Sequence, residues 1–166
     1  MPATDRGKQI DHLTGGFTLI ELMIVVGILG ILIAMAVPTF LHARVPAQNK
    51  QAESLLRYGI TASRVVYSET GTFNGVTNVD LAAAEGSVQW RDATTDAFAG
   101  DRQVSVRSGT IGVESYVLMA TRSASGDCIA TLHPDVTPTR YQLVNGAAHC
   151  SASDFDASVG WSDQLP

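Results

Sequence analysis

The feature that most constrains this chain is an apolar run from Phe17 to Leu41. Between Leu22 and Val37 the run has no charged and no strongly polar side chain. At a helical rise of ~1.5 Å per residue it would span roughly 37 Å, which is enough to cross the ~30 Å hydrocarbon core of a membrane. Leu, Ile, Met and Ala dominate the run, and its glycines, Gly27 and Gly30, are tolerated in membrane helices. The sequence therefore predicts a membrane helix at residues 17–42.

The residues that open this run form a recognisable motif, Gly16-Phe17-Thr18-Leu19-Ile20-Glu21. Followed by an unbroken apolar helix, the motif resembles the processing signature of class III signal peptides. Such peptides belong to the type IV pilin and pseudopilin family, and the chain is most like a type IVa major pilin. The resemblance covers roughly the first 55 residues, and beyond them it is one of layout only.

The segment before the motif, residues 1–16, is polar and carries Arg6 and Lys8. It has no apolar segment of its own, so it is not an ordinary secretory signal. A peptidase that cuts between Gly16 and Phe17 would remove this leader and keep the apolar helix. The resemblance implies that a prepilin peptidase makes this cut, that it N-methylates Phe17, and that the N-terminus is cytoplasmic.

Glu21 is an acid within the first turn of the apolar run, where a lone carboxylate is costly in lipid. Cleavage would free the α-amino group of Phe17, which is largely protonated at neutral pH. Glu21 lies four residues later, which places it on the same helix face as Phe17. The hypothesis, supported by the resemblance, is that Glu21 and Phe17 pair within or between subunits and set their register. The alternative is a Glu21 side chain in the headgroup zone, stabilised by the helix dipole.

Gly30 and Pro38 are expected to soften the apolar helix. Pro38 has no N–H to donate to the carbonyl of Ala34, and Gly30 lowers helix stability a few residues earlier. The simpler interpretation is a kink at the membrane exit. The functional one is that residues 30–38 lose helical order when subunits pack, which would make a filament extensible.

Residues 43–70 are predicted to continue the helix amphipathically. A stripe of small and apolar side chains recurs at three- and four-residue spacings: Ala52, Leu55, Leu56, Ala62, Ser63, Val66 and Tyr67. Lys50, Arg57 and Arg64 recur every seven residues on another face. This basic line is either solvated or in contact with acidic patches on neighbouring subunits. Gly71 is the expected end of the helix.

Residues 71–166 are expected to form a globular head, so the predicted fold class is α+β, with a long N-terminal helix packed on a small antiparallel sheet. Residues 72–100 are interpreted as an irregular loop with a short helix at 79–85, capped by Asp80, and with Trp90 and Phe98 as anchors on the core. The strands are expected at 103–107, 114–121, 128–132 and 141–144. Much of the core signal comes from Val113, Tyr116, Val117 and Leu118.

The two cysteines of the chain, Cys128 and Cys150, both lie in the head. If the head is exported, an even cysteine count suggests one disulfide, with two free thiols as the alternative. A zinc site with His133 and His149 is a weaker possibility, as is calcium at Asp154, Asp156 and Asp163. No metal and no cofactor is predicted. The resemblance implies a bridged C-terminal loop.

The leading interpretation of the whole chain is a non-enzymatic structural subunit of a type IV pilus. The sequence has no phosphate-binding glycine loop, no nucleophile elbow and no recognisable pair of catalytic carboxylates. The family implies four partners, which are identical subunits, the prepilin peptidase, an assembly platform with its ATPase, and the inner membrane. The precursor is expected in that membrane as a single-pass protein, and the mature chain in an extracellular pilus.

Four alternatives remain open. Two lie within the same family, a type II secretion pseudopilin and a minor pilin. Another is a membrane-anchored binding module whose helix is only an anchor. The fourth is a DNA-uptake pilin that uses head arginines (Arg91, Arg102, Arg107, Arg122 and Arg140), but these are scattered among acids in a chain of net charge −5. No specific nucleic-acid partner is therefore predicted.

Overall fold

The computed structural model describes residues 16–98 and 101–164, apart from the side chains of residues 41 and 42. The chain divides into two compact units, Met1–Leu41 and His42–Pro166. The helix α1 (Leu19–Thr70) contributes its first part to one unit and its second part to the other. The predicted leader lies outside the described residues, apart from Gly16.

Helix α1 runs through both Pro38 and Pro46 and is long and apolar enough to cross a membrane. It ends at Thr70, where the N–H of Gly71 donates to the carbonyl of Tyr67 at 2.8 Å. Gly71 has φ +70°, a left-handed conformation that glycine adopts without steric cost. The predicted end of the helix is therefore confirmed.

The second unit contains a five-stranded sheet in the order β1-β2-β3-β4-β5. The strands are β1 (Gln89–Arg91), β2 (Gln103–Ile111), β3 (Glu114–Arg122), β4 (Cys128–Pro134) and β5 (Arg140–Val144). The strands β2 to β5 are antiparallel to their neighbours, whereas β1 pairs in parallel with β2. The α+β prediction is confirmed. The expectation of a wholly antiparallel sheet is wrong at β1, because the long β1–β2 connection lets the chain return in the same direction.

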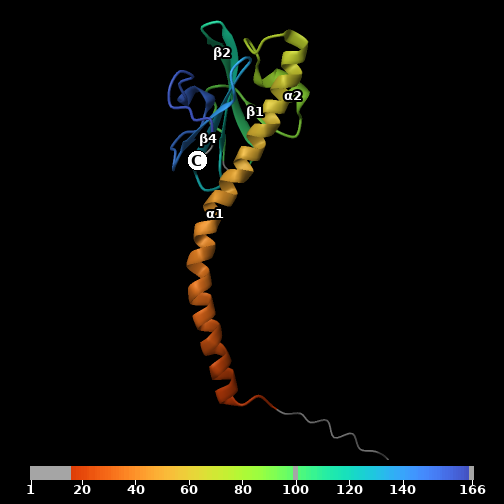
Figure 1. Ribbon diagram of the computed structural model, residues 1–166. Coiled ribbons are helices and arrows are strands. Elements are labelled where there is room, and N and C mark those ends of the chain that lie inside the picture. The colour runs from red at the N-terminus through yellow and green to blue at the C-terminus, as the bar shows by residue number, and fades with distance from the viewer. Residues whose placement is uncertain (1–15, 99–100, 165–166) are drawn as a thin grey trace, which may run out of the picture. The chain divides into compact units, whose positions relative to one another are not determined.

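The sheet separates two layers of core. One face packs on the amphipathic part of α1, where the predicted stripe is buried or half-buried around Leu56, which is fully buried beside Val117 and Met119. The opposite face packs on the C-terminal segment through Leu118, Leu132 and Phe155. Figure 1 shows the part of α1 that belongs to the second unit, together with α2, on one side of the strands and the blue C-terminal segment on the other.

Three expectations for the head need correction. Val113 is 100% exposed, because it lies at the tip of the β2–β3 hairpin rather than within a strand. Phe98 is 58% exposed and does not anchor the loop, whereas Trp90 is buried and donates from Nε1 to the carbonyl of Glu85 at 2.8 Å. The short helix is α2 (Asn78–Ala84), and its cap is Thr77 rather than Asp80.

Thr77 and Asp80 form a capping box that explains why the helix starts where it does. The Thr77 hydroxyl accepts from the N–H of Asp80, and the Asp80 carboxylate accepts from the N–H of Thr77 at 2.8 Å. These hydrogen bonds satisfy backbone donors that a helix start leaves unpaired. The hydrogen bonds from Thr77 also hold the pKa of Asp80 below its ordinary value.

Candidate functional site

The candidate assembly site is the start of α1. Gly16, Phe17 and Thr18 precede the helix, and Thr18 is its N-cap: its hydroxyl accepts from the N–H of Glu21 at 3.2 Å. The carbonyl of Thr18 also accepts from the N–H of Leu22 at 3.2 Å. Sequence reasoning missed Thr18, although Thr-x-x-Glu before an apolar run is the pattern of a capping box.

This cap changes the expected relation between Phe17 and Glu21. Phe17 lies before the first helical residue, Leu19, so the four-residue spacing does not put both residues on one helix face. The reason is local. The Thr18 hydroxyl accepts a hydrogen bond from the N–H of Glu21, and this cap makes the helix begin after Thr18. The backbone N of Phe17 therefore lies outside the helix.

Within the part of the chain that the structure describes, nothing covers the apolar part of α1. The large apolar side chains of Phe17 and of the helix as far as Phe40 are exposed, with fractions from 48% for Val25 to 80% for Phe17. Glu21 is also exposed and has no ion pair with any residue in the described ranges. A continuous apolar surface of this kind marks a membrane or protein interface.

Gly30 and Pro38 both lie inside the helix. A Cβ at Gly30 would meet nothing within 4 Å, so packing inside this chain does not require glycine there. The hydroxyl of Thr39 donates to the carbonyl of Met35 at 3.1 Å, next to the proline that leaves a carbonyl unpaired. The loss of helical order on assembly stays a prediction.

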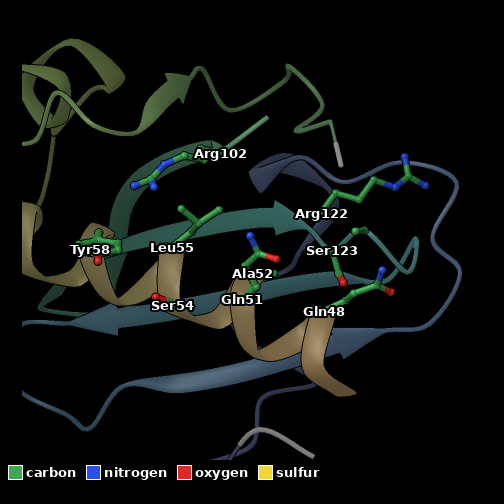
Figure 2. Close-up of a pocket in the computed structure, with 10 residues that line it drawn as sticks. Gln48, Gln51, Ala52, Ser54, Leu55, Tyr58, Arg102, Arg122 and Ser123 are labelled. Atoms are coloured by element: carbon green, nitrogen blue, oxygen red, sulfur yellow. The ribbon is translucent and has the colours of Figure 1, made fainter. Parts of the chain in front are cut away.

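The head contains a pocket of about 170 Å³ beside α1. Figure 2 shows that Arg102 and Arg122 point away from each other at its rim, while Gln48, Gln51 and Ser54 project from the helix. Arg102 donates from Nε to the carbonyl of Ser87 at 3.2 Å, and Arg122 donates to the carbonyl of Ala147. Both guanidinium groups therefore hold loops in place, and no carboxylate lines the pocket.

Cys128 and Cys150 are joined by a disulfide, as predicted, with Cα atoms 5.5 Å apart. Being bonded to each other, they are not available as zinc ligands. Residues 16–98 and 101–164 contain no group of three or more His, Cys, Asp or Glu side chains that could hold a metal ion. Asp154 and Asp156 instead accept hydrogen bonds from Ser151 and Ser158 in their own loop.

Two carboxylates reinforce the bridged loop. Asp96 accepts from the N–H of Cys150 at 2.8 Å and lies 2.9 Å from His149 Nδ1. The hydrogen bond with His149 and the one from Cys150 hold the pKa of Asp96 below its ordinary value. The contact between Asp96 and His149 also raises the pKa of His149.

The second carboxylate is that of Asp127. Asp127 accepts from the Asn49 side chain at 2.9 Å and from the N–H of Gly146 at 3.0 Å, and these bonds lower its pKa.

Two comparisons with known proteins bear on the assembly site. The family model described as the prokaryotic N-terminal methylation motif matches residues 13–37. The type IV major pilin protein PilA of Myxococcus xanthus (strain DK1622) is 41% identical over 89 residues. The chain is similar to type IV pilins. The resemblance predicted from the motif is thereby confirmed.

The extent of the match is limited. The alignment with PilA covers 54% of this chain and 40% of the relative. No solved structure gives a significant match to the chain. The methylation motif overlaps the apolar part of α1, the part that is long and apolar enough to cross a membrane.

Proposed function

We propose that the chain is the structural subunit of a type IV pilus and that it polymerises through the apolar part of α1. The observation that carries the proposal is the exposed apolar surface of α1, which begins with a methylation motif and contains Glu21 as its one acid. A membrane covers such a surface before assembly, and neighbouring helices would cover it afterwards. The similarity to a major pilin supports the same conclusion.

The free energy of moving α1 from the membrane into a filament indicates which interactions must favour assembly. Lipid tails are about as apolar as the side chains of adjacent helices, so moving α1 from lipid into a filament gains little from the hydrophobic effect. The filament must therefore keep water away from the apolar side chains of α1 to the same degree as the membrane does. Close packing and specific polar pairs would supply the preference for the filament, and an assembly platform with an ATPase would supply the work of extraction.

Glu21 is proposed to provide the specific pair. A prepilin peptidase would cut between Gly16 and Phe17 and methylate the new terminus, and residues 1–16 would be lost as the leader. The Phe17 amine would then approach Glu21 of a neighbouring subunit. At a separation of 4 Å and an effective dielectric constant of about 20, two such charges attract by about 4 kcal/mol. Since the apolar run offers a single acid, only one axial register makes this pair.

Gly30 and Pro38 have a proposed role in the same transition. The helix there already lacks one backbone hydrogen bond, and the open space beside Gly30 lets a neighbouring backbone approach closely. Local loss of helical order between them would lengthen the subunit under tension. A filament map with every backbone hydrogen bond intact from residue 30 to 38 would contradict this role.

The test is to shear surface material from cells that express the protein, image it and determine the mature N-terminus by mass spectrometry. The expected result is fibres whose subunit begins at N-methylated Phe17. Glu21→Gln should be cleaved normally but yield at least tenfold fewer fibres, and Leu22→Ala in the same helix turn is the matched control. Mature protein that still begins at Met1 and never polymerises would overturn the proposal.

The same experiment separates a pilus subunit from two of the alternatives left open by the sequence. A type II secretion pseudopilin would give short periplasmic assemblies and no surface fibres. A membrane-anchored binding module would stay monomeric, and Glu21→Gln would leave it unchanged.

A further inference from the structure

One exposed face of α1 within the second unit is basic. Three cations spaced seven residues apart, Lys50, Arg57 and Arg64, form what we call the basic row, and all three are exposed. Glu53 lies beside the row but is only 6% exposed. It accepts from Lys50 at 2.8 Å and from Arg57 at 2.7 Å, so it offsets one of the three positive charges.

Glu53 orients the first two cations of the basic row, Lys50 and Arg57. Burial opposes its ionisation, but the hydrogen bonds and positive charges of Lys50 and Arg57 outweigh burial and lower the pKa of Glu53. The carboxylate therefore stays charged and orients both cations. Their own side chains remain 71% and 70% exposed, so each keeps donors available to a partner.

Arg64 is the member of the row with no ion pair in the described part of the chain. It lines a hollow with His133, Thr139 and Asp135. His133 is buried, and burial and the charge of Arg64 lower its pKa to about 4, so it adds no charge near neutral pH. Asp135 accepts from the hydroxyl and the N–H of Ser115, at 2.7 and 3.2 Å, rather than from Arg64.

The other flank of α1 carries a complementary surface. A groove of about 590 Å³ lies between the last turns of α1 and α2, and we call it the acidic groove. Glu69 and Asp80 line it, and no Lys, Arg or His does. Glu69 is exposed and has no ion pair within residues 16–98 and 101–164, while Thr77 holds Asp80 in place. Apolar contact area is available beside the charges, because Val65 is 45% exposed.

Helix geometry keeps the two surfaces apart within one chain. Glu69 follows Arg64 by five residues, which places it about 140° around the helix axis. A copy therefore cannot pair its own Arg64 with its own Glu69, but two copies side by side can. The rest of the head favours the same approach: residues 71–166 contain five Arg, no Lys and eleven Asp or Glu, so a second copy presents a net negative surface to the row.

We propose that the basic row of one copy docks on the acidic groove of the next, with Arg64 facing Glu69. The contact joins two different surfaces, so it repeats in one direction and builds an open polymer rather than a closed dimer. It rests on the proposed filament and adds the head-to-head contact that the apolar part of α1 cannot specify. Opposed charges at this contact fix the rotation between neighbouring heads.

The experiment is a charge swap in cells that assemble the full-length protein. Arg64→Glu and Glu69→Arg are each expected to lower the yield of sheared fibres at least tenfold, with normal leader cleavage. The double variant, and co-expression of the two single variants, should restore the yield to within about threefold of wild type. In the mixed case, each reversed residue meets the reversed residue of the other variant.

A matched control makes the same change in net charge as Arg64→Glu, two units more negative, at exposed positions outside the basic row and the acidic groove. Val113→Glu combined with Val136→Glu adds two negative charges at positions that are 100% and 77% exposed, and fibre yield should stay near wild type. If only Arg64→Glu is impaired and Glu69→Arg cannot rescue it, the row meets an anionic lipid or polymer and the proposal fails. It also fails if both single variants assemble normally. Wild-type protein that forms no fibres at all would instead refute the proposed function.

Discussion

Removing the disulfide tests how the head holds its C-terminal segment. Cys128 and Cys150 are 1% and 0% exposed, and the bond closes a loop with a sequence separation of 22 residues. In the chain-entropy account, a loop of that size constrains the unfolded chain by about 3 kcal/mol at 25 °C. The double change Cys128→Ser and Cys150→Ser should therefore lower the free energy of unfolding by about 3 kcal/mol, and the midpoint of thermal unfolding by roughly 10 °C.

The folded head should survive this loss. Asp96 still accepts from the N–H of residue 150, and the N–H of Ala97 still donates to the carbonyl of residue 150 at 2.8 Å. Arg122 continues to hold the carbonyl of Ala147. Because these contacts persist without the bond, the change acts mainly on the unfolded state, and the near-ultraviolet spectrum of the folded protein should be unchanged.

The assay is urea and thermal unfolding of the full-length protein in detergent, followed by tryptophan fluorescence. Trp161 is a suitable reporter, since its ring lies 6.2 Å from Phe155 on the C-terminal segment. Reduced wild-type protein is the control that separates the bond from the buried hydroxyls that serine introduces. A loss below about 1 kcal/mol in both samples would refute the argument from loop closure.

Three further predictions follow from single side chains. Burial and the nearby Arg64 guanidinium lower the pKa of His133 to about 4, so the folded state favours the neutral imidazole. The contribution of His133 to stability should be full above about pH 6.5, and about 3 kcal/mol should be lost as the pH falls from 6.5 to 4. His133→Asn should remove this part of the pH dependence in pH-resolved melts. A Cβ at Gly59 would clash with Met119, so Gly59→Val should destabilise the head by about 1–3 kcal/mol in the same unfolding assay, and Met119→Ala in the same chain should relieve part of the loss. Thr18→Ala should weaken the helix start by about 1 kcal/mol, seen as faster amide exchange at Glu21, whereas Thr18→Ser should preserve protection.

The apolar helix and the methylation motif could be predicted from the sequence because both are local. An uninterrupted apolar run depends only on its own residues, and the identity of Gly16, Phe17 and Glu21 suffices to recognise the motif. Thr18 was equally local, and the Thr-x-x-Glu spacing contained its signal. The amphipathic stripe around Leu56 was predictable for the same reason, since a helical period relates neighbours in the chain.

The head could be predicted only in outline. Val113 has the composition of a core residue, but its exposure depends on where the β2–β3 hairpin turns. The strand β1 is three residues long and has no alternating pattern of its own, so only its pairing with β2 defines it. Glu53 looks like one charge among others on a helix, and only the packing of α1 on the sheet reveals that it is buried.

The sequence by itself determined that this chain has an apolar helix long enough to cross a membrane, a methylation motif at the start of that helix, and an α+β head. The tertiary structure alone decided which cations stay exposed, that an acidic groove lies on the opposite flank of α1, and that Asp96 supports Cys150 from 54 positions away in the chain. The physical reason is the range of the interactions. Helix periodicity and caps act over three or four residues, whereas burial and ion pairing depend on contacts that form only when the sheet has assembled.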